Sequence, residues 1–275
     1  NTFSIINSWI AEHNIDNYYN VDAGTLVPSS SINVGIERSK SDWIALIDCG
    51  LMFPHNWLES QLDTAVSNNA DVVIGSVVLH GLNVIDQAAV SQTYGYNQIR
   101  ECVPSSLIKK DIFQRYGLFL DNRRAGFDLH WRRMIHGTEA DVILSKNPLV
   151  TYFQTNFINS LTSLYKKVYL YSKSSTNMPS YYIPYYAILT FIVVLLYIFR
   201  SEHKFYSFLI VTTIYIIVRG FIVPLIKSNE LNSIFNRPTL ILCLPIVGAI
   251  IDTSKIHGFI AGILNDILKY IKKFL

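Results

Sequence analysis

Two long apolar segments near the carboxyl end most strongly constrain how this chain folds. Residues 181–199 carry no charged side chain, and residues 205–226 carry only Arg219. Each segment is close to the about 20 residues that an α-helix needs to cross a bilayer. A third segment, 238–251, is shorter and contains Pro245, so it fits a thin span, a re-entrant segment or a buried helix. The sequence therefore predicts two or three membrane segments.

The tail of the chain has a different pattern. Between residues 256 and 273 apolar side chains recur with helical spacing, and lysines lie beyond the apolar face. This predicts an amphipathic helix in the membrane interface, and the alternative is a helix packed on the spans. We therefore expect two parts, a globular domain at residues 1–176 and a membrane region at residues 177–275.

Charge and cysteine content limit the class of protein and its compartment. The formal net charge of +3 does not indicate a nucleic-acid surface, so no nucleic-acid partner is expected. Lys166, Lys167 and Lys173 precede the first span and favour a cytoplasmic domain, although Arg200 and Lys204 between the spans act against this. The three cysteines have neither disulfide-framework nor metal-ligand spacing, which fits a reducing compartment. We expect a multi-pass membrane protein.

Strands and helices alternate in the globular part. Apolar runs at 18–22, 43–48 and 71–79 read as strands, and a helical pattern at 56–68 follows the second run. Such alternation is typical of an α/β domain with a mostly parallel, Rossmann-like sheet. A helical pattern at 2–13 opens the chain where such domains normally have a strand, so we expect the first strand to be lacking.

The signal is less regular beyond residue 81. A polar stretch reaches residue 97 without a clear element. After it, the pattern predicts an extended segment at 99–108, helices at 110–115 and 127–135, strands at 141–144 and 150–154, and a helix at 156–172 that leads to the membrane.

Two acidic residues follow predicted strands. Asp22 ends the first strand and Asp48 the second, and ligands of α/β sheets bind at the carboxyl ends of strands. Aspartate is also common in turns, so each residue has a purely structural alternative. Their paired placement favours a ligand site.

Five short motifs occur in order between Ile5 and Thr155. They are Val21-Asp22-Ala23-Gly24-Thr25; Asn33-x-Gly35 with Trp43 to Asp48; Pro54-x-x-Trp57-Leu58-Glu59; Val103 to Phe113 with Gly117-x-Phe119; and Gly126-Phe127-Asp128. In this order they resemble glycosyltransferase family 2, a family of inverting enzymes whose catalytic domain has the GT-A fold. The following spans are similar to those of membrane-bound members that build exopolysaccharides or lipid-linked glycans.

The resemblance implies a set of site residues. The nucleotide-sugar donor would be bound by Asp22, Gly24, Asn33, Asp48 and Gly50, and the acceptor side would contain Ser105, Ser106, Trp131 and Arg132. Asp128 would be the catalytic base that takes a proton from the acceptor hydroxyl. Asp48 would hold Mg²⁺ or Mn²⁺ at the donor diphosphate. The implied partners are a nucleotide sugar, a lipid-linked or glycan acceptor, and membrane lipids.

The metal motif departs from the family pattern. Gly50 replaces the second carboxylate of Asp-x-Asp, so a cation would be held mostly by diphosphate and water, or be replaced by basic side chains. The basic residues nearest in sequence are Arg123, Arg124, Arg132 and Arg133.

The base motif departs as well, because Phe127 stands where the family has glutamate. A second alignment matches Asp128-Leu129-x-x-Arg132 to the family's "DLxxR" and places Ala125 or Gly126 at the base position, which predicts an impaired enzyme. Asp128 also has a structural alternative, since an acid in the first turn of a helix favours the helix dipole. Trp131 is also explained by packing alone.

Two functions agree best with these sequence features. The first is a membrane-bound inverting glycosyltransferase that moves a sugar from a nucleotide sugar to a lipid-linked or polysaccharide acceptor. The alternative is a catalytically degenerate scaffold subunit of a glycan-assembly complex. Arg219 is costly inside a span unless it is paired, so it would either hold an acceptor phosphate or pair with the interfacial helix.

Overall fold

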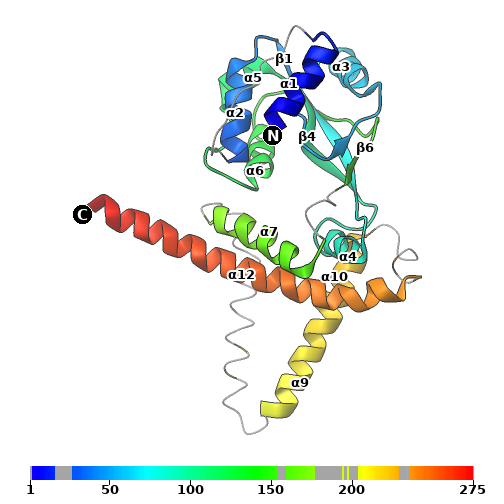
Figure 1. The fold of residues 1–275 in the computed structure, drawn as a ribbon, viewed down its shortest axis with the longest axis vertical. Helices are drawn as coiled ribbons and strands as arrows, with labels where there is room; N and C mark the ends of the chain where they lie inside the picture. The colour runs from blue at the N-terminus through cyan, green and yellow to red at the C-terminus, as the bar shows by residue number, and fades with distance from the viewer. Residues whose placement is uncertain are drawn as a thin grey trace.

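The computed structural model describes residues 2–15, 27–153, 159–176, 194, 197, 204–228, 234 and 236–274. A sheet with its covering helices forms the upper part of the molecule, and a group of long helices lies below it (Figure 1). The upper part contains α1 (Thr2–Glu12), α2 (Pro28–Arg38), β1 (Trp43–Ala45), β2 (Leu51–Met52), α3 (Trp57–Ser67), β3 (Val72–His80), β4 (Ile99–Lys109), α5 (Lys110–Tyr116), α6 (Phe127–Ile135), β5 (Val142–Leu144) and β6 (Val150–Phe153). The lower part contains α4 (Val84–Thr93), α7 (Leu161–Ser174), α9 (Lys204–Tyr215), η3 (Ile216–Ile222), α10 (Val223–Lys227) and α12 (Pro238–Phe274).

The six described strands form one mixed sheet. Their order is β1-β4-β3-β6-β2, and β5 also pairs with β3. β3 is parallel to β5 and β6, whereas β4 is antiparallel to both β1 and β3, and β2 is antiparallel to β6. The α/β class is confirmed, but the expected mostly parallel pairing is wrong for these strands because the long β4 runs back between β1 and β3. The predicted strand at 18–22 lies outside the described residues.

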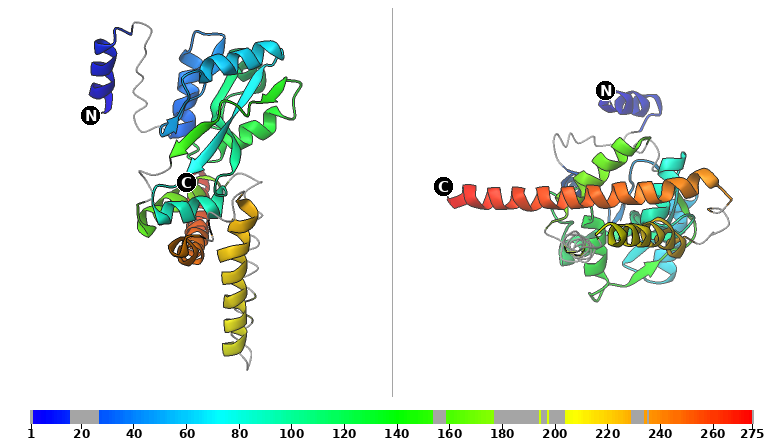
Figure 2. Two further views of the ribbon diagram at one scale, coloured as in Figure 1. Left: turned by 90° about the vertical axis from the view of Figure 1, so that its right-hand side faces the viewer. Right: turned by 90° about the horizontal axis from the view of Figure 1, so that it is seen from below.

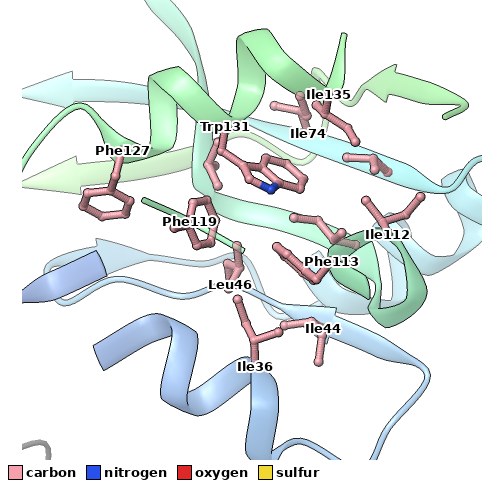
Figure 3. Packing of buried hydrophobic residues seen from close by; sticks show 13 residues of the cluster. Ile36, Ile44, Leu46, Ile74, Ile112, Phe113, Phe119, Phe127, Trp131 and Ile135 are labelled. Atoms are coloured by element: carbon pink, nitrogen blue, oxygen red, sulfur yellow. The ribbon is translucent and has the colours of Figure 1, made fainter. Parts of the chain in front are cut away.

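The central strand explains the core. Every residue of β3 from Val72 to Leu79 is buried, as expected for a strand covered on both faces. On one face α2, α5 and α6 enclose a cluster that includes Ile36, Phe113 and Trp131 (Figure 3). On the other face Ala65 of α3 packs against β3 and β4. The domain therefore has helices on both sides of its sheet.

The helices below the sheet pack on one another. Ala88 of α4, Leu164 of α7, and Leu244 and Ile251 of α12 belong to one buried cluster. α7 approaches α12 closely at two glycines, since a Cβ on Gly258 would lie 2.3 Å from the Tyr169 carbonyl oxygen. One helical turn later, a Cβ on Gly262 would lie 2.4 Å from a Thr176 methyl group. Of these elements α4 had not been predicted.

One apolar helix leads away from this layer. The helical stretch Lys204–Lys227 is long and apolar enough to cross a membrane and is only 11% buried over its most apolar window. It agrees with the segment predicted at 205–226, and Figure 2 (left) shows it running away from the sheet domain. The predicted span at 181–199 lies outside the described residues apart from positions 194 and 197.

The carboxy-terminal region differs from the prediction. The expected short segment at 238–251 and interfacial helix at 256–273 form one 37-residue helix, α12, with Pro245 inside it. The polar residues after Ile251 do not break the helix because Asp252 pairs with Arg219 of η3. By length and composition Pro238–Lys272 is a second helix able to cross a membrane. Seen from below, it extends across the underside of the molecule (Figure 2, right).

Candidate active site

Asp48 lies in a tight turn between β1 and β2. Its carboxylate accepts a hydrogen bond from the Cys49 amide at 2.8 Å, and the Leu51 amide reaches the Asp48 carbonyl at 3.4 Å. Gly50 has φ +90°, a conformation that side-chain-bearing residues adopt at a cost. Glycine at the second carboxylate position of the motif is therefore required by the turn. The Asp48 side chain is exposed.

Asp128 lies in the first turn of α6. Gly126 precedes the helix with φ +79°, and the buried rings of Phe127 and Trp131 anchor the helix in the core (Figure 3). Burial raises the pKa of the Asp128 carboxyl above its usual value. Hydrogen bonds from the amides of Leu129 and Asp128 itself and the charge of Arg132 oppose this shift, and the charge of Asp48 adds to it.

The structure brings Asp48 and Asp128 into one electrostatic environment. Burial is the main cause of the raised pKa of Asp128, of Tyr152 in β6 and of Tyr171 in α7. The Asp48 charge adds to the shift in all three. Tyr152 is placed there because it pairs with Leu51 in the β2–β6 ladder. Burial, followed by the charges of both acids, raises the pKa of the Cys102 thiol to about 12. Cys102 therefore lies beside these two acids as a neutral thiol.

Lys167 and Tyr171 were missed by the sequence analysis as site residues. They lie one helical turn apart on α7, and the Lys167 ammonium is 5.8 Å from the centre of the Tyr171 ring. Burial lowers the pKa of Lys167, and the charges of Asp86 and Asp48 act in the opposite direction. The i, i+4 spacing was visible in sequence, but the effect of the Asp48 charge on both residues was not.

Asn33 has its hydrogen bonds within the protein. Its amide nitrogen donates to the Phe119 carbonyl at 2.8 Å and to the Asp121 carboxylate at 3.0 Å, and its oxygen accepts from the Phe119 amide at 3.1 Å. The side chain is buried. This geometry favours a role in fixing the 117–121 loop on α2 over the predicted contact with the donor.

Ser105 and Ser106 support an irregularity in β4. Both are buried, and both hydroxyls donate to the Cys102 carbonyl, at 2.9 and 3.0 Å. The ladder with β3 shifts register here, next to Pro104, which has no amide hydrogen to donate. Ser106 also accepts from the Gly75 amide at 3.3 Å. These contacts favour structural roles over the predicted acceptor contacts.

The aromatic and basic residues in and just before α6 also have contacts within the protein. Trp131 is 1% exposed and donates to the Gly117 carbonyl at 3.1 Å, so its packing explanation is the better one. Arg132 forms an ion pair with Glu101 at 2.9 Å. Arg123 donates to the Ser174 carbonyl at 3.1 Å, and Arg124 is exposed with its charge near Tyr171. Arg132 therefore lies near Asp128 with a partner of its own.

The fit of a divalent cation is limited. Across the described parts of the chain there is no group of three or more His, Cys, Asp or Glu side chains that could hold a metal ion. Asp48 offers a single exposed carboxylate, and Gly50 offers no side chain. A cation at Asp48 would therefore take most of its ligands from the diphosphate and water. The two other predicted donor residues, Asp22 and Gly24, lie outside the described residues.

Comparison with known proteins identifies a family for the region that contains this site. Residues 18–135 match the model of glycosyl transferase family 2. These residues form a family 2 glycosyltransferase domain. The match includes both Asp48 and Asp128 and ends at the last residue of α6. The sheet with helices on both faces is accordingly the GT-A domain expected from the sequence, and α7 and α12 lie outside the matched range.

Solved structures add a distant likeness. Residues 1–349 of TarS from S. aureus, in complex with UDP-GlcNAc, are 11% identical with a TM-score of 0.38, and the match covers 64% of this chain and 54% of that one. A second structure of the same TarS segment is 10% identical with a TM-score of 0.39 and covers 94% and 76%. The chain thus spans about half of the first TarS segment. No curated protein matches the sequence.

Proposed function

We propose that this family 2 domain transfers a sugar from a nucleotide-sugar donor to a lipid-linked or glycan acceptor at a membrane surface. The observation that carries the proposal is the shared electrostatic environment of Asp48 and Asp128 within the part of the chain that matches the family. Asp48 is the donor-side residue, with Asp22 and Gly24 as further donor contacts. Asp128 is the catalytic base.

The proposed reaction is a single in-line displacement. The ionised Asp128 takes the proton of an acceptor hydroxyl while that oxygen attacks the anomeric carbon. The bond from this carbon to the diphosphate oxygen breaks on the opposite face, and the nucleoside diphosphate leaves with the bonding electrons. One displacement inverts the anomeric configuration. Asp128 suits this role because α6 is anchored by the buried Trp131, which holds the carboxylate in place.

The membrane placement is part of the proposal. The helix Lys204–Lys227 crosses the bilayer, segment 181–199 supplies a second crossing, and the globular domain lies on the cytoplasmic side. The lysines of α7 support this orientation. A lipid-linked acceptor would then reach the site along the layer formed by α7 and α12.

The first test is release of nucleoside diphosphate from UDP- and GDP-sugars by the full chain in lipid nanodiscs. Replacing the base should remove at least about a hundredfold of the rate, as expected when general base catalysis is lost. The variant is Asp128→Asn, and Asp63→Asn on the exposed face of α3 is the control. Release by the wild type that is unchanged in Asp128→Asn would reject the assignment of the base.

A catalytically degenerate scaffold is the second candidate. Gly50 in the metal motif favours it, as does the alignment that places Ala125 or Gly126 at the base position. This candidate predicts that the wild type binds UDP or GDP but releases nothing from any nucleotide sugar in the panel. The same release assay therefore separates the two functions.

A further inference from the structure

Lys167 is a basic side chain on which the charge of the buried Asp86 acts most strongly, followed by that of Asp48. It is half-buried on α7, and among the described residues it forms neither a hydrogen bond nor an ion pair. Its recorded neighbours are the Tyr171 ring and the charges of Asp86 and Asp48. Burying part of an ammonium group without an ion pair costs free energy, and a bound anion would offset that cost.

Packing fixes the position of this lysine. α7 begins with a capping box between Ser160 and Ser163, and Leu164 is 2% exposed in the cluster with α4 and α12. At the other end of the helix, the Ser174 carbonyl accepts a hydrogen bond from Arg123 of the family 2 domain. Lys167 is therefore carried by a helix that is secured at both ends and whose carboxyl end meets the loop that leads to Asp128.

The charge balance of the site calls for such a residue. Asp48 and Asp128 contribute two carboxylates, and a nucleoside diphosphate adds further negative charge. Gly50 leaves Asp48 as the only carboxylate of its motif, so the motif offers a divalent cation one side-chain ligand. Arg132 is already paired with Glu101 and Arg123 is bound to α7, which leaves Lys167 and the exposed Arg124 as the basic side chains near the site.

We propose that Lys167 binds a substrate phosphate, in the first place the diphosphate of the nucleotide-sugar donor, and stabilises the negative charge that the leaving diphosphate develops. This proposal rests on the proposed function and adds a residue from outside the range that matches the family. The second source of the same chemistry is the phosphate of a lipid in the membrane next to α7. The hydrogen bond from Arg123 to the Ser174 carbonyl places α7 beside the loop that leads to Asp128, which favours the donor.

Nucleotide affinity tests the proposal. Binding of UDP, GDP and the parent nucleosides is measured on the full chain in phosphatidylcholine nanodiscs, with Mg²⁺ and with chelator. Lys167→Ala should weaken binding of the diphosphate about tenfold or more and leave the nucleoside unchanged, whereas Lys167→Arg keeps most of the affinity. Lys166→Ala is the matched control, since Lys166 is exposed on the same helix and should have no effect.

A second measurement distinguishes the two sources of phosphate. Native mass spectrometry of protein from nanodiscs that contain phosphatidic acid counts the anionic lipid retained by each variant. Loss of this lipid in Lys167→Ala, with unchanged affinity for the nucleotide, would assign the lysine to a lipid phosphate. Unchanged binding of both ligands overturns the inference and leaves the family 2 activity standing. A wild type that binds no nucleotide even with Mg²⁺ overturns the proposed function and this inference with it.

Discussion

Asp128 acts in the proposed reaction only as a carboxylate, so its pKa sets the acid side of the pH profile. Burial holds this pKa above the ordinary value of 3.8, with Asp48 adding to the shift and Arg132 opposing it. Activity is therefore full above the raised pKa and falls as the pH drops through it. The acid limb of kcat/KM should lie above the range of an exposed aspartate.

Removing the positive charge of Arg132 should move this limb further. Arg132→Gln takes away a charge that favours the carboxylate form of Asp128, so the acid limb of kcat/KM shifts to higher pH. The measurement is the pH profile of nucleoside diphosphate release. Arg133→Gln, on the exposed side of the same helix, should leave the profile in place. A limb that does not move in Arg132→Gln would show that this charge does not act on the base.

Individual side chains show how far the sequence alone could go. Asp48 and Asp128 were predicted from local motifs, and the Asp48 charge is one of the causes of the raised pKa of Asp128. Asn33 and Ser105 sit in matching motifs, yet their hydrogen-bond partners are in distant segments or in a strand irregularity. Lys167 lies outside every motif, so only the packing of α7 could have identified it.

At the scale of elements, the contact between η3 and α12 joins the span to the layer beneath the domain. Arg219 binds both carboxylate oxygens of Asp252, at 2.7 and 3.0 Å, and Tyr215 donates to the same carboxylate at 3.0 Å. Arg219 also donates to Gln92 of α4. The pairing explanation for Arg219 is thus favoured over a contact with an acceptor phosphate. η3 is a π-helical segment, and the wider turn at Gly220 passes Pro245 closely.

Breaking this ion pair should loosen the span from α12. Asp252→Asn leaves the Arg219 guanidinium without its counter-charge and should cost about 2 kcal/mol or more of stability. Arg219→Leu combined with Asp252→Leu removes both charges and should recover most of the loss. Thermal unfolding in detergent of the wild type, Arg219→Leu, Asp252→Leu and the double variant forms the double-mutant cycle. Strictly additive effects would show that the pair contributes no coupling.

Element boundaries were predicted correctly where a local apolar pattern sets them. α6 spans Phe127–Ile135, as predicted, because its buried Phe127, Trp131 and Ile135 have clear helical spacing. α4 was missed although Asn83 caps it, since its small buried residues gave a weak apolar pattern. The sequence predicted a break near Asp252, but the helix continues through this residue. The break was predicted wrongly because Arg219, which pairs with Asp252, lies on another helix.

At the scale of the whole molecule, the two apolar helices have different directions. The stretch Lys204–Lys227 leads away from the sheet domain, and α12 crosses beneath that domain (Figures 1 and 2). If the first crosses the bilayer, α12 lies along its surface in spite of its length. One face of α12 is buried on α4 and α7, and exposed apolar side chains, including Leu242, Leu264 and Leu268, lie elsewhere along the helix. The site above α7 would then stand at the level of the lipid headgroups.

Spin labels along α12 test this placement. Leu242, Thr253 and Leu264 are exposed and are spaced 11 residues apart, close to three helical turns, so they share one face. The outer two positions are about 33 Å apart at 1.5 Å per residue, which is about the thickness of the hydrocarbon core. A surface helix gives all three labels a similar shallow depth by power-saturation measurements, with Ile214 of α9 as the deep reference. A spanning α12 instead places the Thr253 label near the bilayer centre, and that result would overturn the placement of the site at the membrane surface.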